Sequence, residues 1–494
     1  MAAVMFQGTG SDVGKSVLVA GVCRALVNRG LKVLPFKPQN MSNNAAVTRD
    51  GGEIGRAQAL QAVACRVPPA VDMNPVLLKP QADRTSQLVV HGRVRGQLRA
   101  GNFREARASL LSEVMASFER LHAACDIVVV EGAGSPAEIN LRAGDIANMG
   151  FARAADVPVI LVGDIDRGGV IASIIGTKAV IDPADARMIA GFLINKFRGD
   201  PSLFEDGYRQ IEQLSGWRGF GVVPWLAEVA RLPSEDAVVL ERKAGPAGEM
   251  RPLIVACPIT PRLSNFDDLD PLAHMPGVEV RMIRPGSPLP VEADLMVLAG
   301  SKATVADLEF LRAEGWEIDL LAHVRRGGRV LGICGGYQML GRTISDPDGS
   351  EGPATTVPGL GLLAVDTVLS GAKTLRSVEG TALEAAFDGY EMHIGVTTGP
   401  DTARPLARLS DGWHDGAVSA TGRVMGTYVH GLFNKATQRD AWIALLGGEG
   451  AESAPDHAVL VDEALDAIAA KIERHVDVEA LIALSRRAGH HQNQ

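Results

Sequence analysis

Residues 3–20 read AVMFQGTGSDVGKSVLVA and decide the fold of the first half of the chain. An apolar run is followed by three glycines, and a helical apolar pattern begins after Lys15 and Ser16. A strand, a glycine-rich loop and a helix in this order are typical of the phosphate-binding loop of α/β domains. The stretch therefore predicts a parallel α/β sheet with a phosphate site at the end of its first strand.

The loop carries the groups that bind a nucleotide phosphate. Its glycines let backbone N–H groups turn inward, Lys15 supplies a positive charge, and the Ser16 hydroxyl can ligate Mg²⁺. The predicted ATP-binding residues are Gly8, Thr9, Gly10, Asp12, Val13, Gly14, Lys15 and Ser16, with Asn195 after a later strand. Thr9 stands where the strict motif has glycine. The alternatives are a glycine-rich turn without a ligand and, for Asn195, an ordinary turn residue.

An acidic residue closes another buried strand. Residues 127–131 read IVVVE, so Glu131 stands at the carboxyl end of that run. A carboxylate at the end of a parallel strand beside a phosphate loop is placed to be a second Mg²⁺ ligand. The predicted metal ligands are Ser16, Glu131 and Glu53, and the alternative for Glu131 is a turn or helix-capping acid.

The second chemical signal is a thiol on a predicted sharp turn. Residues 329–340 read RVLGICGGYQML, in which the glycines around Cys334 have the spacing of a nucleophile elbow. A cysteine at a helix N-terminus has a depressed pKa, and the Gly335 N–H can enter an oxyanion hole. We predict Cys334 as the nucleophile and His430, at the end of strand 424–429, as its base, with His393 as the alternative base.

Composition bounds the class of protein. The 494 residues are 46% hydrophobic and carry a net charge of −9. This hydrophobicity excludes a disordered chain, and the acidic balance argues against an extended nucleic-acid-binding face. No apolar run reaches the roughly 18 residues of a membrane helix, and we expect no signal peptide. Five scattered cysteines exclude a disulfide framework and favour a reducing cytoplasm.

Short apolar runs alternate with helix-length segments along both halves of the chain. This alternation predicts two α/β domains, each with a mostly parallel sheet covered by helices on both faces. The expected strands are 3–7, 32–36, 127–131, 158–163 and 189–194, then 253–257, 279–283, 294–299, 329–333 and 424–429. The expected boundaries are 1–230 for the nucleotide-binding domain, 231–251 for a linker, 252–445 for the thiol-bearing domain and 446–494 for a C-terminal helical segment.

Both motifs resemble those of known enzymes. The loop is similar to that of dethiobiotin synthetase and its amidotransferase relatives, and the thiol pattern G-x-C-x-G-x-Q resembles the class I glutamine amidotransferases. The second resemblance implies an oxyanion and glutamine site made by Gly300, Ser301, Gly335 and Gln338. Most class I members have Pro-Glu after the histidine, which completes a triad. Gly431 and Leu432 follow His430 here, so that position supplies no orienting acid.

The combination of the two domains resembles the cobyric acid synthase family over about residues 1–440. The most specific passages are GEIGRAQA (52–59), NPVLLKP (74–80), GDIDRGG (163–169), NKFRGD (195–200) and SNFDDLDPL (264–272). The resemblance implies glutamine- and ATP-dependent amidation of the b, d, e and g carboxylates of adenosylcobyrinic acid a,c-diamide to cobyric acid. The alternatives are a cobyrinic acid a,c-diamide synthase-like enzyme, a cell-wall carboxylate amidase, and a nucleotide switch with a decayed amidotransferase module.

The implied substrate carries several ionised side chains, which an acidic protein can hold only where positive charge is concentrated. Lys37, Lys79 and Arg84 in the polar region 37–87 are the predicted corrinoid-binding residues, and solvated surface residues are the alternative. The expected partners are the corrinoid, glutamine and ATP with Mg²⁺. We expect no tightly bound organic cofactor, no nucleic acid and no membrane partner, and a homo-oligomer is compatible with the sequence.

Overall fold

The computed structural model describes residues 2–82, 85–99, 109–233, 251–448 and 454–487. The chain divides into two compact units. The first comprises residues 1–42, 48–232 and 461–494, and the second comprises residues 43–47 and 233–460. The return of the C-terminal residues to the first unit is a long-range feature that the sequence does not predict.

The first unit is built on a six-stranded parallel sheet in the order β12-β11-β10-β1-β9-β2. Its strands are β1 (Ala2–Gly8), β2 (Val33–Phe36), β9 (Ile127–Glu131), β10 (Val159–Asp164), β11 (Ile189–Phe197) and β12 (Arg218–Pro224). The five strands expected in this half are confirmed. Because β1 pairs with β9 and β10, the loop that follows β1 is flanked by the carboxyl ends of both neighbours.

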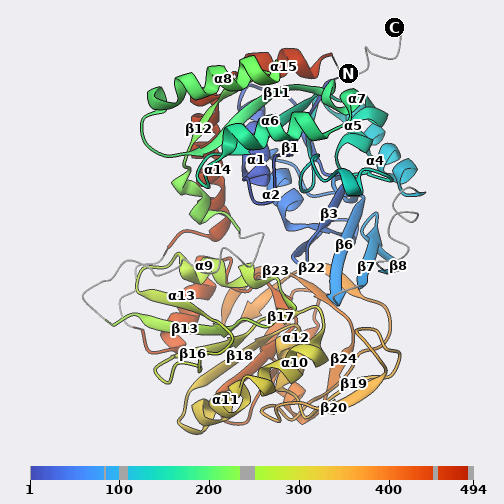
Figure 1. Cartoon of the computed structure of the whole chain (residues 1–494). Helices are drawn as coiled ribbons and strands as arrows, with labels where there is room; N and C mark the ends of the chain where they lie inside the picture. Colours follow the sequence, from blue (N-terminus) through green and yellow to red (C-terminus); the bar gives the residue numbers. More distant parts are fainter. Residues whose placement is uncertain (1, 83–84, 100–108, 234–250, 449–453, 488–494) are drawn as a thin grey trace. The chain divides into compact units, whose positions relative to one another are not determined.

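Helices cover both faces of this sheet, as Figure 1 shows. They are α1 (Lys15–Asn28), α2 (Arg56–Ala64), α4 (Leu111–Ala124), α5 (Met149–Ala155), α6 (Val170–Val180), α7 (Pro183–Ala186), α8 (Glu205–Ser215), α14 (His457–His475) and α15 (Val478–Ser485). Successive residues of β1 point to opposite faces. Val4 and Phe6 enter a core with α1, α14 and α15, while Ala3 and Met5 enter a core with α4 and α5.

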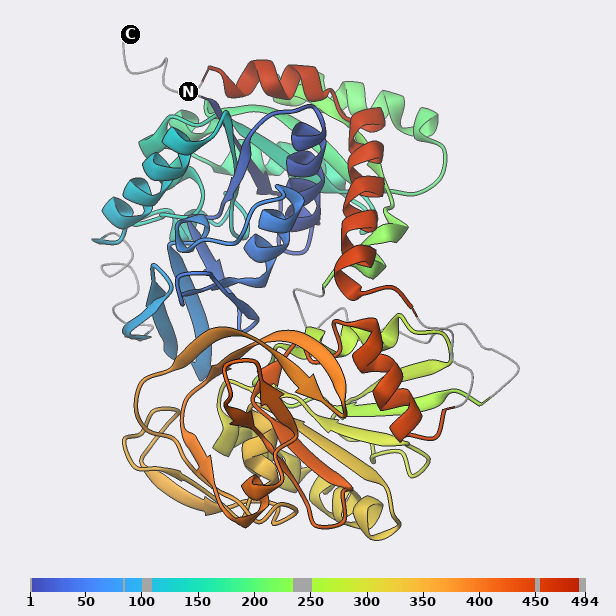
Figure 2. The same cartoon turned by 180° about the vertical axis from the view of Figure 1, so that it is seen from behind.

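The C-terminal helices complete one of these cores. Ile468 and Ile472 of α14 are fully buried, and both lie within 3.0 Å of where a side chain on Gly21 of α1 would begin. Figure 2 shows α14, in red, running beside the blue N-terminal helices. The apolar pattern predicted over 459–487 therefore forms two helices of the first unit. None of the helices in the described ranges has the length and apolar character of a membrane span.

Part of the polar region 37–90 forms a small four-stranded sheet in the first unit. Its order is β3-β6-β7-β8, with β3 (Gln39–Met41) parallel to β6 (Val76–Ala82), and β7 (Thr85–Val90) and β8 (Arg93–Arg99) antiparallel. The short strand β5 (Glu53–Gly55) leads into α2. Many polar side chains of this region are buried, so it is not a set of solvated loops.

The second unit has its own six-stranded sheet, in the order β15-β13-β16-β18-β28-β27. Its strands are β13 (Leu253–Pro258), β15 (Val278–Ile283), β16 (Leu295–Leu298), β18 (Arg329–Ile333), β27 (Ala417–Val418) and β28 (Val424–Thr427). All but β27 run parallel. The helices are α9 (Asp270–Ala273), α10 (Thr304–Ala313), α11 (Trp316–Arg325), α12 (Gly335–Leu340) and α13 (Ala436–Leu445). The five strands expected here are confirmed.

Smaller sheets in the second unit were not expected from the sequence. One joins β22 (Thr374–Ala382), β23 (Ala385–His393), β25 (Ala407–Leu409), β26 (His414–Asp415) and β29 (Val429–His430), and it is antiparallel. Another joins β19 (Thr343–Asp346), β20 (Thr355–Pro358), β21 (Asp366–Val368) and β24 (Val396–Thr398). A third pairs β14 (Leu263–Ser264) with β17 (Gly300–Ser301). Half-polar strands of this kind give a weaker apolar signal than the buried parallel strands do.

Candidate active sites

The phosphate loop closes around Lys15 at the carboxyl end of β1. Lys15 is the first residue of α1, and its Nζ donates to the carbonyl oxygens of Gly10 and Gly134, each 3.2 Å away. Asn195 at the end of β11 donates its Nδ2 to the carbonyl oxygen of Val13 over 2.8 Å. The structure therefore brings Asn195, predicted from a distant strand, onto the loop that carries Lys15.

Two basic residues outside the predicted set also contact this loop. Lys196 donates its Nζ to the carbonyl oxygen of Asp12 over 2.6 Å and pairs with Asp164 over 2.9 Å. Arg167 pairs with the Asp12 side chain. These residues belong to the passages 163–169 and 195–200 that carry the family resemblance, which is the signal that would have found them.

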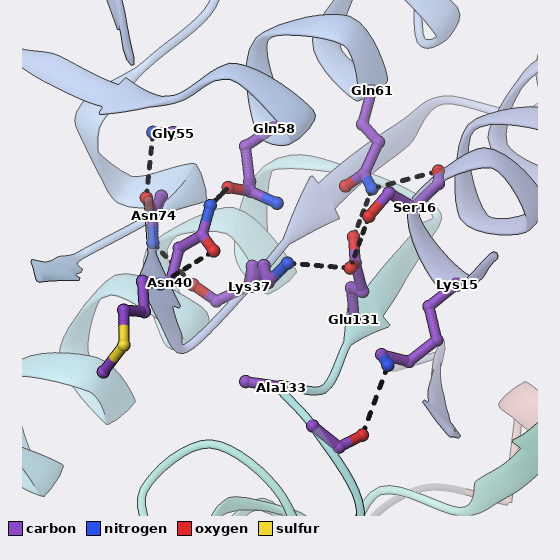
Figure 3. A network of polar contacts seen from close by, with 12 residues as sticks. Lys15, Ser16, Lys37, Asn40, Gly55, Gln58, Gln61, Asn74, Glu131 and Ala133 are labelled. Atoms are coloured by element: carbon purple, nitrogen blue, oxygen red, sulfur yellow. Dashed lines mark hydrogen bonds and ion pairs between the residues drawn. The ribbon is translucent and has the colours of Figure 1, made fainter. Parts of the chain in front are cut away.

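Glu131 is the centre of a polar network next to the loop (Figure 3). Its Oε1 accepts from the Ser16 hydroxyl and from Lys37 Nζ, both at 2.8 Å, and its Oε2 accepts from Gln61 Nε2 at 2.5 Å. Burial alone would raise the pKa of Glu131, but the charge and hydrogen bond of Lys37 hold it below its ordinary value. Glu131 is thus an ionised carboxylate placed 2.8 Å from the Ser16 hydroxyl.

The donor set fits Mg²⁺. No group of three His, Cys, Asp or Glu side chains in the described ranges could hold a metal ion. Mg²⁺ at phosphoryl-transfer sites is bound through one or two protein oxygens, with the substrate phosphates and water completing its shell. Ser16 and Glu131 supply two such oxygens beside the loop.

The predicted lysines do not form an exposed positive patch. Lys37 is 5% exposed and pairs with Glu131, and Lys79 is 3% exposed and pairs with Glu53 over 2.8 Å. Each of the two lysines is thus balanced by a carboxylate, because a buried ammonium is stable only with an opposite charge beside it. The same pair argues against Glu53 as a metal ligand. Arg84 lies outside the described residues, and contact of either lysine with a corrinoid stays a prediction.

In the second unit, Cys334 sits on the turn between β18 and α12. Its backbone has φ 54° and ψ −111°, a conformation that non-glycine residues adopt at a cost. The thiol is 8% exposed and donates to the carbonyl oxygen of Met392 over 3.4 Å. The strained strand–turn–helix is the elbow that the glycine spacing predicts.

The backbone of the elbow packs against the loop that ends in β17. A Cβ on Gly335 would lie 2.8 Å from the Ser301 backbone nitrogen, so this close approach requires glycine. A Cβ on Gly300 would lie 3.3 Å from Cε1 of His430. The structure thus gathers Gly300, Ser301, Gly335 and His430 around the turn that carries the thiol.

The acid that orients His430 comes from a distant part of the sequence. Nδ1 of His430 lies 2.7 Å from Oδ2 of Asp268, and Oδ1 of Asp268 accepts from the Gly431 N–H over 2.8 Å. Burial alone would lower the pKa of His430. The charge and hydrogen bond of Asp268, with a hydrogen bond to Cys334, raise that pKa to about 10. Asp268 was not among the residues predicted from the sequence, although it lies in the family-specific passage 264–272.

His393, the alternative base, has a different environment. Its ring stacks on Tyr428 with centroids 3.7 Å apart, and its Nδ1 is buried without a hydrogen-bond partner. Burial lowers the pKa of His393 to about 4, so the imidazole is neutral and is packed as an aromatic ring. The geometry therefore favours His430 over His393 as the base.

Gln338 joins the thiol loop to a half-buried acid. Its Oε1 accepts from the Thr304 hydroxyl over 3.2 Å, and its Nε2 donates to the carbonyl oxygen of Ile394 over 3.0 Å. The Thr304 backbone N–H donates in turn to Glu351 over 2.5 Å. Burial raises the pKa of Glu351 to about 7, although Lys302 and Thr304 act in the opposite direction. Sequence analysis assigned nothing to Glu351, which lies in a segment without a motif.

These two sites define an ATP-dependent glutamine amidotransferase, with a nucleotide-binding unit and a thiol glutaminase unit on one chain. Residues 4–239 match the family model described as CobQ/CobB/MinD/ParA nucleotide binding domain, and residues 254–438 match the CobB/CobQ-like glutamine amidotransferase domain. The chain belongs to the cobyric acid synthase family.

Membership rests on full-length relatives. A cobyric acid synthase of Rhizorhabdus wittichii is 73% identical over 489 residues, which cover 99% of this chain and 100% of the relative. Those of Novosphingobium aromaticivorans and Sphingopyxis alaskensis are 68% and 67% identical and cover 97% and 98% of this chain, and 97% and 99% of the relatives.

Proposed function

We propose that this chain amidates the b, d, e and g carboxylates of adenosylcobyrinic acid a,c-diamide, with glutamine as nitrogen donor and ATP as activator. The observation that carries the proposal is that relatives matched over almost their whole length bear the name of that activity. The two sites support it, because each supplies the groups that its half of the reaction needs.

In the glutaminase half, Cys334 gives its thiol proton to His430, and the resulting thiolate attacks the carboxamide carbon of glutamine. Asp268 holds the imidazole and stabilises its protonated form, which the raised pKa of His430 reflects. In this proposal the backbone N–H groups of Gly335 and Ser301 stabilise the oxyanion. The imidazolium gives its proton to the leaving nitrogen, so ammonia departs, and water then hydrolyses the thioester to glutamate and thiol.

In the synthetase half, a corrinoid carboxylate oxygen attacks the γ-phosphorus of ATP, which releases ADP and leaves an acyl phosphate. Ammonia then attacks the acyl carbon and displaces phosphate. Lys15 is placed to hold the β- and γ-phosphates, and Ser16 and Glu131 would hold Mg²⁺. Mg²⁺ would neutralise charge on the phosphates. Lys37 pairs with Glu131 and balances the charge of this buried carboxylate.

Glu351 fits the recognition of glutamine itself. Glutamine carries an α-ammonium group that needs a negative partner in a desolvated site. Thr304 bridges the two side chains, because its backbone N–H donates to Glu351 and its hydroxyl donates to Gln338. A carboxylate therefore lies one bridging residue away from the amide that is predicted to bind glutamine. A pKa of about 7 describes this carboxylate without its counter-charge, and an ammonium partner would lower it.

The test of the proposed function is incubation of the purified chain with ATP, Mg²⁺, glutamine and the a,c-diamide. Mass spectrometry should show four successive conversions of a carboxylic acid to a carboxamide, with one ATP consumed for each. A chain that hydrolyses glutamine and ATP but leaves the a,c-diamide unchanged would instead be an amidase for another carboxylate, such as cobyrinic acid or a cell-wall precursor. We propose the corrinoid, glutamine and ATP as the partners of this chain, and the cytoplasm as its location.

A further inference from the structure

Several buried glutamines have an unpaired side-chain amide atom, and two of them, Gln58 and Gln61, lie at the Glu131 network (Figure 3). Within the described residues, one side-chain amide atom is without a hydrogen-bond partner in each of five glutamines that are at most 6% exposed: Gln7, Gln39, Gln58, Gln61 and Gln87. Buried polar atoms are normally paired, so each exception asks for an explanation. A ligand that completes these bonds is one explanation when the atoms lie beside an active site.

The orientation of the Gln58 amide is determined by its neighbours. The backbone N–H of Met41 donates to Oδ1 of Asn40 over 2.8 Å, so Nδ2 is the free end of the Asn40 amide. That Nδ2 donates to Oε1 of Gln58 over 3.1 Å. The Gln58 amide is therefore held by its oxygen, and its Nε2 is left as an unpaired donor. In Figure 3 this Nε2 points away from Asn40, on the side where Lys37 lies.

The Asn40–Gln58 contact is built into the backbone. A Cβ on Gly55 would lie 2.2 Å from Nδ2 of Asn40 and 2.8 Å from Oε1 of Gln58, so only glycine leaves room for the pair. The Gly55 N–H donates to Asn74, whose Nδ2 donates to the carbonyl oxygen of Lys37. The donor is thus fixed relative to the strand end that carries Lys37.

Gln58 lies next to the residues that are predicted to bind the ATP phosphates and Mg²⁺, but it makes no hydrogen bond to them among the described residues. Gln61 lies one helical turn further along α2 and contacts both Glu131 and the carbonyl oxygen of Ser16. Residues three apart on a helix lie on the same side, about 5 Å apart. A ligand atom bound to Gln58 would therefore lie close to Gln61 and the Glu131 network without being part of that network.

We propose that Gln58 binds a side-chain oxygen of the corrinoid next to the carboxylate that is being activated. A neutral donor at this position holds carboxylate and carboxamide side chains alike. The inference rests on the proposed function, in which the same site must accept the substrate before and after each amidation. The oxygen acceptor of a carboxylate survives as the carbonyl oxygen of the amide, so an N–H donor keeps its partner at every stage.

A lysine at this position would discriminate between the stages. An ammonium group prefers a carboxylate to an amide, so its hold would weaken as the substrate loses charge. The two lysines of this region are instead paired with Glu131 and Glu53. Gln58 is fully buried, but burial does not argue against ligand binding here. Lys15 and Glu131, which we assign to ATP and Mg²⁺, are only 8% and 1% exposed.

The test compares the dissociation constants of the a,c-diamide and of the fully amidated product, measured by equilibrium dialysis of the full chain without ATP or glutamine. The wild type should bind both within about threefold of each other. Gln58→Glu keeps the bond from Asn40 but presents an oxygen that repels a carboxylate and accepts from an amide. It should weaken binding of the a,c-diamide about tenfold and leave the product unchanged.

Two further variants make the result specific. Gln58→Met removes the donor and should weaken both ligands alike. Gln438→Glu, at a fully buried glutamine of α13 whose amide atoms are also unpaired, is the matched control and should leave the ratio unchanged.

Three results would be decisive. Unchanged dissociation constants in Gln58→Met, or equal weakening of both ligands in Gln58→Glu, would overturn the assignment of Gln58. A wild type that neither binds nor amidates the a,c-diamide would overturn the proposed function instead.

Discussion

Asp268 shows how a single residue can complete a site. It lies 162 positions before His430 in the chain, yet its carboxylate contacts both the imidazole and the Gly431 N–H. The bond to Nδ1 fixes the ring orientation, and the carboxylate stabilises the imidazolium that forms when the ring holds the thiol proton. A glutamate two positions after the histidine, as in most class I members, is therefore not needed to orient this ring.

Asp268→Asn should keep the packing but lose the charge. We expect glutamine-driven amidation to fall about ten-thousandfold, in line with the same change in serine protease triads, while ammonia-driven amidation is retained. Initial rates with each nitrogen donor measure this. An equal loss with both donors would mean that Asp268 supports the fold and not the imidazole.

The same substitution carries a pH prediction for stability. A histidine whose pKa is raised from 6.5 to about 10 on folding adds stability that is fully present below pH 6.5 and is lost as the pH rises through about 10. The free energy of unfolding should therefore fall more steeply between these values in wild type than in Asp268→Asn. Urea titrations at pH 6, 8 and 10 would show it, and parallel curves would contradict it.

Cys334→Ser and His430→Ala should each abolish glutamine-driven amidation and spare amidation with added ammonia. The reason is that the synthetase half has its own phosphate site. His393→Ala is the control, since that ring is packed under Tyr428 and its Nδ1 is buried without a partner. If His393→Ala abolishes glutamine-driven amidation and spares ammonia-driven amidation, and His430→Ala does not, the base is His393.

The glutamine-binding role proposed for Glu351 predicts a dependence on pH. Its pKa of about 7 means that the ionised form is lost as the pH falls through 7, so the KM for glutamine should rise in that direction. Glu351→Gln should raise the KM about tenfold at pH 8 and remove the pH dependence, with kcat for ammonia unchanged. Glutaminase assays from pH 6 to 8 measure both, and a pH dependence that survives the substitution would exclude Glu351 as its source.

At the level of elements, α14 is the helix that seals the first unit. Ile472→Ala removes a fully buried side chain and should cost about 2–5 kcal/mol in the free energy of unfolding. Val459→Ala on the same helix, at 47% exposure, should change it by less than about 0.5 kcal/mol. Urea denaturation of the full chain compares them. Equal effects would mean that α14 does not pack as described.

At the level of the whole molecule, two chemistries depend on different units. Lys15→Ala removes the charge facing the ATP phosphates, so amidation should fail with either nitrogen donor while glutamine hydrolysis continues. Assays of amidation, ATP hydrolysis and glutamate release on one preparation test this. ATP turnover at the wild-type rate would place the nucleotide at a different site.

Local patterns were enough to predict both reactive loops. The phosphate loop and the elbow at Cys334 are each formed by a strand, a turn and a helix within about 20 residues, so the spacing of glycines and apolar residues records their geometry directly. The parallel strands were equally predictable, because strands buried on both faces leave continuous apolar runs. The antiparallel strands of the second unit leave no such run.

Tertiary structure alone decided what surrounds those loops. Asp268 beside His430, Lys37 beside Glu131 and α14 beside α1 each join residues about 90 or more positions apart. No local period links such residues, since their contact depends on how separate elements pack. The same limit explains why Lys37 and Lys79 resembled a substrate patch in the sequence. The sequence shows that a lysine is positively charged, but only the tertiary structure shows whether a carboxylate lies close enough to neutralise that charge.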